Sequence, residues 1–509
     1  MDIRKQGKCK LADYVELFNE NDEELYSNIP NEKATEFLED NIPYFHCPDK
    51  NIESTYYFRW WTYRKHVKQT PGGYVITEFL PDVPWSGKYN TISCPAAHHY
   101  YEGRWLHNPQ YLNDYSDFWL GKGGDPRLYS FWIANALHAR NLVQPDDHSL
   151  IRHLPKLVKN YEAWENSWQQ GEHRIGRWKN GLYWTTDDRD GGEVSIGGHG
   201  FRPTLNSFMY GDAIALADIA NLAGDAELSE LYQNKALELK QLIQDKLWDS
   251  EANFFKILSS EGKLSSVKEL YGYTPWYFNL PDSGYEQGWQ ELMNPEGFKA
   301  PFGPTFAEQR HPEFVISYEG HECQWNGPSW PLATCSVLTA LANLLNNYKQ
   351  KVIDKQAYFD TLQCYTKSHR VVREDGVEVP WIDENLNPYS GDWISRTRLE
   401  KWKDGTWCTE KGGYERGKDY NHSTYNDLII TGLVGLRPRA DNVIEVNPLL
   451  PEASWDHFCL DNVLYHGKNL CVIWDISGTV YNMGQGLLIF ANGVLLAQSE
   501  KLGRLKASL

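Results

Sequence analysis

Apolar residues recur at α-helical spacing, in segments of one to two dozen residues, through most of the chain between about residues 125 and 430. In the clearest pair, 205–224 and 225–249, Gly224 is placed to end one helix and Asp225 to cap the next. Such helices form an antiparallel hairpin because each must bury its apolar face. Similar pairs occur at 129–141 with 147–168 and at 329–346 with 354–369, and residues 31–67 supply earlier helical material. The repeated hairpins predict a mainly α chain closed into a toroid.

The segments between the predicted hairpins are too long to be simple connections. Residues 70–127, 171–205, 249–328 and 372–427 contain most of the tryptophan, glycine and charged residues. Long loops in a compact domain are usually functional, and in a ring of hairpins they can gather at one mouth. We therefore expect the site to be built from these four loops.

The last part of the chain has a different pattern. From about residue 436 onward, apolar and polar residues alternate as in β-strands, and Asn492-Gly493 is a typical hairpin turn. The sequence therefore predicts a helical domain over residues 1–435 and a small antiparallel, β-sandwich-like module over residues 436–509.

Charge and hydropathy restrict the possible partners. Lys and Arg number 50 against 68 Asp and Glu, for a net charge of −18, and no basic block is present that would follow a phosphate backbone. No apolar stretch reaches membrane-spanning length. Nucleic acid and membrane are thus not expected as partners. The chain as printed is expected to be soluble and cytoplasmic, or periplasmic or secreted if an export signal has been removed.

The sequence contains no recognisable cofactor or metal motif. Its nine cysteines are scattered and never form a CxxC pair, which argues against a disulfide scaffold and a zinc cluster. His98-His99 lacks further ligands at recurrent metal spacing, and no nucleotide-binding glycine loop follows a predicted strand. We expect no cofactor and no metal.

Aromatic residues are unusually frequent and lie in polar surroundings. The chain has 21 Trp, 31 Tyr and 19 Phe, many beside Asp, Glu, Arg or Asn. Flat rings next to hydrogen-bonding groups suit sugars, which present C–H faces and hydroxyl edges. Large aromatic cores would explain the same composition, so the pattern favours carbohydrate without requiring it.

Four carboxylates lie within seven positions of the loop at 181–213, namely Asp187, Asp188, Asp190 and Glu193. Crowded carboxylates raise one another's pKa, so one of them can keep its proton near neutral pH and act as a general acid. Calcium binding is an alternative, although the spacing lacks the alternation of an EF-hand loop. A solvated acidic turn is the other alternative.

A second acidic segment, residues 380–396, places Asp383 and Glu384 between two tryptophans and before an Asn-Pro turn. That context would fix a carboxylate in an aromatic wall, as a general base near a water requires. Two further segments, 318–345 and 414–433, carry aromatic and amide side chains ahead of predicted helices. Structural packing is the alternative role for both.

An early cluster of aromatic and charged residues at 58–108 is a further candidate sugar-binding region. Together with the loops above, it completes the set of side chains that we expect to bind substrate. These are Trp61, Arg64, Glu102, Arg104, Trp105, Trp184, Glu193, Arg202, Gln324, Trp325, Trp330, Tyr420 and His422.

Taken together, these segments resemble the six-hairpin (α/α)6 glycosidases of the trehalase, mannosylglycerate hydrolase and glycoside hydrolase family 63 group. DENLNPYSG at 383–391 is similar to the group's ENYNPxTG motif, with Glu384 in the position of its general base, and QWNGPSWP at 324–331 resembles its aromatic signature before a helix. The loop at 181–213, which we call the acid loop, departs from the SGxDxSPR motif that is common in this group. The resemblance implies an Asp general acid, placed at Asp190 and then at Asp188, with Glu193 as a substrate or structural contact.

The resemblance further implies hydrolysis of a terminal glycosidic bond of an oligosaccharide or glycoside, by inversion. Acid and base then stand roughly 6.5–9.5 Å apart with a water between them. One alternative is a polysaccharide lyase or sugar epimerase, for which Arg202, Tyr420 and His422 would supply the charge and the base. The other alternative is a carbohydrate-binding protein without activity.

Overall fold

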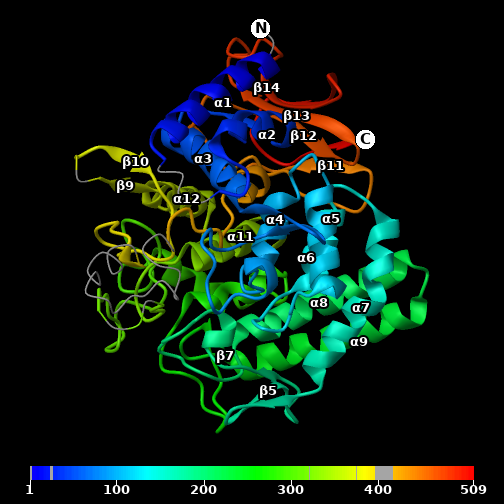
Figure 1. The fold of residues 1–509 in the computed structure, drawn as a ribbon, viewed down its shortest axis with the longest axis vertical. Coiled ribbons are helices and arrows are strands. Elements are labelled where there is room, and N and C mark those ends of the chain that lie inside the picture. Colours follow the sequence, from blue (N-terminus) through cyan, green and yellow to red (C-terminus); the bar gives the residue numbers. More distant parts are fainter. Residues whose placement is uncertain (1–2, 23–26, 320, 322, 374, 396–416) are drawn as a thin grey trace.

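The computed structural model describes residues 3–22, 27–319, 321, 323–373, 375–395 and 417–509 (Figure 1). Its helices are α1 (Ile3–Glu20), α2 (Ala34–Asn41), α3 (Lys50–His66), α4 (Ala96–Gly103), α5 (Gln110–Asp117), α6 (Ile133–Asn141), α7 (Asp147–Glu165), α8 (Pro203–Leu222), α9 (Ala226–Leu247), α10 (Thr274–Tyr277), α11 (Pro331–Asn347), α12 (Lys355–Ser368) and α14 (Asn426–Leu428). None of the described helices is both long enough and apolar enough to cross a bilayer.

The predicted hairpins are present as α6–α7, α8–α9 and α11–α12. Between α8 and α9 the chain turns at Gly224, whose φ is +76°, and the Asp225 side chain accepts the backbone N–H of Leu228. Pro203 and Pro331 stand at the first positions of α8 and α11, where a missing N–H costs no helical hydrogen bond. The local signals in the sequence therefore set the ends of these helices.

The C-terminal sheet has the order β1-β12-β13-β14-β15, with β1 (Tyr44–His46), β12 (His457–Tyr465), β13 (Lys468–Asp475), β14 (Gly486–Ala491) and β15 (Val494–Ser499). All neighbouring pairs are antiparallel, and Phe458 pairs with Trp474 between β12 and β13. The turn at Asn492-Gly493 has positive φ at both residues, as the sequence predicts. Strand β1 comes from the N-terminal part, so the sheet is not built from residues after 436 alone.

The remaining strands form short two- and three-stranded pieces. These are β11 (Val443–Val446) with β16 (Leu505–Ser508), β2 (Val67–Thr70) with β3 (Gly73–Ile76), β4 (Trp168–Gln170) with β5 (His173–Arg177) and β6 (Tyr183–Trp184), β7 (Trp248–Asp249) with β8 (Phe254–Phe255), and β9 (Arg370–Val372) with β10 (Glu378–Pro380). Several of these strand pairs lie within the long loops or at their ends. A mainly α fold with a small C-terminal antiparallel sheet, as predicted, is confirmed.

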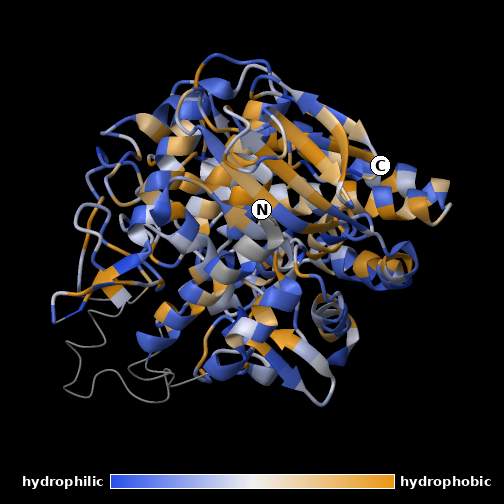
Figure 2. Cartoon of the chain, turned by 90° about the horizontal axis from the view of Figure 1, so that it is seen from above, coloured by the Kyte–Doolittle hydropathy of each residue, from blue (hydrophilic) through white to orange (hydrophobic). Residues whose placement is uncertain are grey.

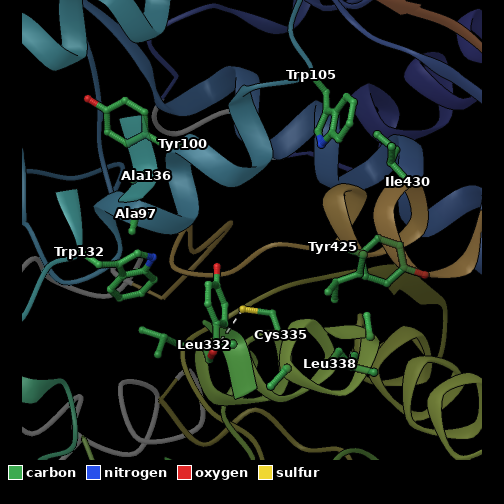
Figure 3. Close-up of a cluster of buried hydrophobic side chains, with 14 of the residues drawn as sticks. Ala97, Tyr100, Trp105, Trp132, Ala136, Leu332, Cys335, Leu338, Tyr425 and Ile430 are labelled. Carbon is green, nitrogen blue, oxygen red and sulfur yellow. Dashed lines mark hydrogen bonds between the residues drawn. The ribbon is translucent and has the colours of Figure 1, made fainter. Parts of the chain in front are cut away.

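Apolar side chains connect the helical part and the sheet into one core. Helices α8 and α11 are buried over most of their length, whereas α7 and α9 have many exposed residues. Helices at the outside of the molecule show polar and apolar residues side by side (Figure 2). In the centre, Trp132, Leu332 and Tyr425 come from three different parts of the chain and lie in one buried cluster (Figure 3). The inner helices are thus buried over most of their surface, with Ile214 and Asp218 of α8 exposed, as in the centre of a ring.

Helix α4 and the two residues that follow it contact α14 through the side chains of Glu102, Arg104 and Trp105. The Glu102 carboxylate accepts the backbone N–H groups of Tyr425 (3.1 Å), Asn426 (2.9 Å) and Asp427 (2.9 Å). Arg104 and Trp105 both donate to Asp427 Oδ1, each at 2.7 Å. An early helix is thereby fixed to the start of α14.

Replacing Glu102 with Ala should destabilise the fold, because three buried N–H groups at the start of α14 would lose their acceptor. The expected loss is about 2–4 kcal/mol in the free energy of unfolding. Chemical denaturation measures it. Glu230→Ala, on the exposed face of α9, is the control and should change stability by less than about 0.5 kcal/mol. Equal effects of the two variants would contradict this role.

Candidate active site

The acid loop turns sharply between β6 and α8. Residues Asp188–Asp190 form a 3-10 turn that ends at Gly191, whose φ is +60°. A Cβ on Gly191 would lie 2.7 Å from Cys94 Sγ, so the close approach of the thiol requires glycine here. The turn brings Asp190 and Glu193 to the inner side of the loop, whereas Asp188 is exposed.

Asp190 is buried in an ion pair. Arg202 Nε lies 2.7 Å from Asp190 Oδ2, and the Thr204 hydroxyl donates to the same oxygen. Burial raises the pKa of Asp190, while the Arg202 charge and the Thr204 hydrogen bond act in the opposite direction. Because Arg202 and Thr204 flank the first residue of α8, this helix fixes the position of Asp190.

Glu193 is surrounded by aromatic and acidic groups. Trp325 donates its Nε1–H to Glu193 Oε2 over 3.1 Å, and its backbone N–H donates to the Glu193 carbonyl, also over 3.1 Å. Burial raises the pKa of Glu193 to about 8, and the negative charges of Glu384 and Asp188 add to the rise. Glu193 therefore holds its proton to a higher pH than an ordinary glutamic acid side chain does.

Glu384 accepts hydrogen bonds from three side chains of different segments. These come from Cys323 Sγ (3.3 Å) and Tyr420 (3.3 Å) to Oε1, and from Ser395 (3.0 Å) to Oε2. His422 Nε2 lies 3.1 Å from the Glu384 carbonyl oxygen, so this nitrogen carries the hydrogen. Burial lowers the pKa of His422 well below its usual value, which keeps the imidazole neutral.

The tryptophans of the 324–330 segment stack on each other beside Glu193. The rings of Trp325 and Trp330 stack at 3.7 Å with an angle of 9°, and Tyr271 packs on Trp325 at 5.6 Å. Trp330 donates its Nε1–H to the Gln324 carbonyl, which fixes the turn before α11. Since this segment contacts Glu193 through Trp325 and Glu384 through Cys323, it bridges both carboxylates.

The carboxylates of the acid loop and of the 384 segment converge on one place. Burial raises the pKa of Cys94 well above its usual value, and the charges of Glu78, Glu193, Asp190 and Glu384 raise it further. Four acidic groups from three segments are thus near enough to this thiol for their charges to affect it. This juxtaposition is the one on which the sequence interpretation depends.

Trp184 contacts the outer side of the acid loop rather than the acidic groups near Cys94. Its ring stacks with His173 at 5.4 Å and with Trp178 at 5.8 Å, and it lies near His199, whose Nδ1 is 3.0 Å from Asp187 Oδ1. Trp184 therefore supports the outer side of the loop.

The predicted substrate-binding residues of the early cluster have structural contacts instead. Trp61 packs against Phe18 and donates to Asn19, and Arg64 donates to the Ile29 carbonyl and to Asn31. Glu102, Arg104 and Trp105 bind the start of α14, as described above. All five are buried. Their polar groups are satisfied within the protein, which explains the residue types without a ligand.

The sequence interpretation did not select several residues that the structure brings to the site. Glu78 accepts the Tyr420 hydroxyl at 2.9 Å, and Tyr271 donates to the Gly191 carbonyl at 2.8 Å. Ser395 and Cys323 contact Glu384. Only their proximity in sequence to selected residues could have indicated Ser395 and Cys323. Glu78 belongs to the early aromatic and charged cluster at 58–108 but is not among the side chains expected to bind substrate, and nothing in the sequence distinguished Tyr271 from other aromatic residues. Within the described part of the chain, no three His, Cys, Asp or Glu side chains form a group able to bind a metal ion.

Comparison with known proteins gives a family and a fold. The model of the mannosylglycerate hydrolase MGH1-like glycoside hydrolase domain matches residues 88–423, and that of the glycosyl hydrolase family 65 C-terminal domain matches residues 436–496. A solved structure named sialidase is 42% identical over 98% of this chain, with a TM-score of 0.89; the present chain spans 44% of its length.

Two more distant structures were also found. A GH78 family rhamnosidase of Bacillus sp. GL1 is 11% identical over 85% of this chain and 40% of its own, with a TM-score of 0.55. A GH63 mannosylglycerate hydrolase from Thermus thermophilus is 12% identical over 65% of this chain and 96% of its own, with a TM-score of 0.47. The predicted (α/α)6 toroid of six-hairpin glycosidases is confirmed.

The raised pKa of Glu193 predicts a pH-dependent effect on stability. A carboxyl whose pKa is about 8 when folded, against an ordinary 4.5, favours the folded state below about pH 4.5 and loses that contribution as the pH rises through 8. Gln cannot ionise, so Glu193→Gln should gain stability over the wild type between pH 5 and pH 9, by on the order of 2–4 kcal/mol at pH 9.

Denaturant unfolding of both proteins across this pH range measures the difference. Val194→Ala, in the same loop, changes no titratable group and is the control. A difference between Glu193→Gln and the wild type that stays constant from pH 5 to pH 9 would contradict the protonation of Glu193.

Proposed function

Because this chain belongs to the mannosylglycerate hydrolase MGH1-like glycoside hydrolase family, we propose that it hydrolyses a terminal glycosidic bond with Glu384 as general base and Glu193 as general acid. The observation that carries the proposal is the pairing of Glu193 with Glu384. The pKa of Glu193 is raised to about 8, and the charge of Glu384 contributes to that rise. Two carboxyl groups in opposite protonation states are what acid–base hydrolysis of a glycoside needs.

Glu193 replaces Asp190 as our candidate for the proton donor. Although burial raises the pKa of Asp190, its Oδ2 is already occupied by Arg202 and Thr204, so this oxygen is fixed against α8 rather than free for a substrate. Asp188 is exposed to solvent. Glu193 combines burial, neighbouring negative charge and a hydrogen bond from Trp325. Residues Gly191–Ser195 read GGEVS and can be aligned with the GxDxS part of the group's SGxDxSPR motif. In this alignment Glu193 takes the position of the motif's aspartate.

In the proposed reaction, Glu193 donates its proton to the departing glycosidic oxygen while the bond to the anomeric carbon breaks. A water attacks that carbon from the opposite face, and Glu384 accepts the proton that the water releases. The products are an alcohol or shortened oligosaccharide and a free sugar of inverted configuration. Cys323, Tyr420 and Ser395 orient the Glu384 carboxylate, and Trp325, stacked on Trp330, holds Glu193 through its indole N–H.

We propose a neutral oligosaccharide or glycoside as substrate. The acidic side chains Glu78 and Glu384, which both contact the Tyr420 hydroxyl, would repel a carboxylated sugar. A sialoside is the second candidate, because of the 42% identity to a structure named sialidase, of which this chain spans 44%. A panel of neutral nitrophenyl glycosides and oligosaccharides, with a sialoside included, separates the two.

Substitution of either catalytic candidate should abolish turnover. Glu193→Gln and Glu384→Gln should each lower kcat on a cleaved substrate by about 100-fold or more, the usual scale for losing a positioned acid or base, with binding retained. Asp190→Asn and Asp188→Asn test the other donors, and Glu313→Gln on the surface is the control. Normal activity of Glu193→Gln together with an inactive Asp190→Asn would return the acid role to Asp190.

The pH profile and the product supply a second test. Since the acid must be protonated, kcat/KM should fall as the pH rises through about 8, the pKa of Glu193. Proton NMR of the first product should show the anomer opposite to the substrate. Release of an unsaturated sugar would instead indicate a lyase, binding by calorimetry without any product would indicate a carbohydrate-binding protein, and a retained anomer would exclude inversion.

A further inference from the structure

The Tyr420 hydroxyl lies between two buried carboxyl groups. Its oxygen is 2.9 Å from Glu78 Oε1 and 3.3 Å from Glu384 Oε1, and all three side chains are buried. A phenol has one hydrogen, which it donates to only one of the two acceptors at a time. The other contact becomes a hydrogen bond only if the carboxyl group supplies a hydrogen itself.

The segment that follows β3 holds Tyr420 in this position. The backbone N–H of Asn421 donates to the Glu78 carbonyl at 3.1 Å, and the Asn421 side-chain amide donates to the Thr77 carbonyl, also at 3.1 Å. The ring of Phe79 meets the ring of Tyr420 edge-on, with 5.0 Å between the centroids. Backbone and ring contacts therefore keep the Tyr420 hydroxyl within reach of Glu78.

The charges of the two carboxyl groups favour one shared proton. Two ionised carboxylates that contact one buried hydroxyl repel each other, and this repulsion favours protonation of one of them. Glu384 accepts two further hydrogen bonds, from Cys323 at 3.3 Å and from Ser395 at 3.0 Å, and donors of this kind favour an ionised carboxylate. Glu78, which has the shorter contact to Tyr420, is therefore the better holder of the proton.

We propose that Glu78 is a positioning residue that holds a proton, donates it in a hydrogen bond to the Tyr420 oxygen, and so directs the Tyr420 O–H toward Glu384. The inference rests on the proposed function and adds a residue to it. In this order of hydrogen bonds Glu384 has three donors and stays ionised, so it can accept the proton that the attacking water releases. Glu78 and Glu384 together then carry one negative charge.

Other titratable groups face these three side chains from several elements. They are Cys94, Tyr129, Glu193, Cys323, Asp383 and His422. Burial raises the pKa of Cys94 and of Tyr129 and lowers the pKa of His422, so these three groups stay neutral near neutral pH. Glu193, whose pKa is raised to about 8, sets the alkaline side of the rate profile, and the acidic side reports the base Glu384.

Infrared spectroscopy near neutral pH tests the protonation directly. Glu78→Gln should lose one carboxyl group's share of the neutral-carboxyl C=O band that the wild type shows. Glu102, Glu193 and Asp212, whose pKa values are raised by burial, contribute to this band in both proteins and cancel in the difference.

Glu53→Gln is the matched control for the infrared band. Glu53 is also a buried glutamate that accepts a tyrosine hydroxyl, that of Tyr14 at 2.9 Å, but Lys50 Nζ lies 2.9 Å from the same oxygen. A carboxylate paired with a lysine contributes no neutral-carboxyl band, so the difference between Glu53→Gln and the wild type should show none.

The pH profile of kcat/KM on a cleaved glycoside is the second readout. Tyr420→Phe removes a donor from Glu384 and should move the acidic side of the profile upward by about 1 pH unit, the scale for one hydrogen bond to a charged group. Glu78→Ala should move it in the same direction, because the hydroxyl loses its orientation. Glu78→Gln should reverse most of that shift, since an amide N–H also donates to Tyr420. Tyr14→Phe, at the matched tyrosine, should leave the profile in place.

The results separate this inference from the proposed function. An unchanged infrared band in Glu78→Gln, or a downward shift of the acidic side in Glu78→Ala, would show that Glu78 is ionised and would overturn the inference, with the hydrolase intact. If the wild type cleaves no glycoside, the proposed function fails, and the infrared difference still decides whether Glu78 holds the proton.

Discussion

The closure of the helical ring depends on one buried carboxylate that binds backbone N–H groups. Glu102 of α4 accepts three such groups at the start of α14, and Arg104 and Trp105 complete the contact through Asp427. Burial raises the pKa of Glu102 to about 7, and the Arg59 charge opposes that rise. The segment that this contact fixes, together with Lys65 on Asp419 at 2.7 Å, also carries Tyr420 and His422 to Glu384. The contacts that close the ring of helices therefore also position Tyr420 and His422 against Glu384.

The site places similar acidic groups in different environments. Asp190 is paired with the Arg202 cation. Glu193 accepts an indole N–H and lies near other acidic groups. Glu384 accepts hydrogen bonds from one thiol and two hydroxyl groups. Because a pKa depends on burial and on adjacent charge, these surroundings allow one carboxyl to keep a proton while another lacks it. The loop provides this separation through two glycines between Asp190 and Glu193, which direct the two side chains to different neighbours.

The parts of the fold with local signals could be predicted from the sequence. The hairpins α8–α9 and α11–α12, the cap at Asp225, the proline starts and the turn at Asn492-Gly493 all depend on neighbouring residues. The roles of Arg104 and Trp105 could not be predicted, because their partner Asp427 lies more than 300 positions away and buried ion pairs use the same residue types as sugar sites. The acidic segments were identifiable, but the partner that each carboxylate obtains is set by tertiary contacts.

The pairing of β1 with β12 has a consequence for how the chain is made. On the ribosome, Tyr44–His46 emerge long before His457–Tyr465, the strand with which they pair, and must wait for it. Until then, β1 has an unpaired edge, and so does β12 whenever Tyr44–His46 are absent. Detached from the helices, the C-terminal sheet would expose a backbone edge open to pairing with strands of other molecules, so the N-terminal segment also protects the protein from aggregation.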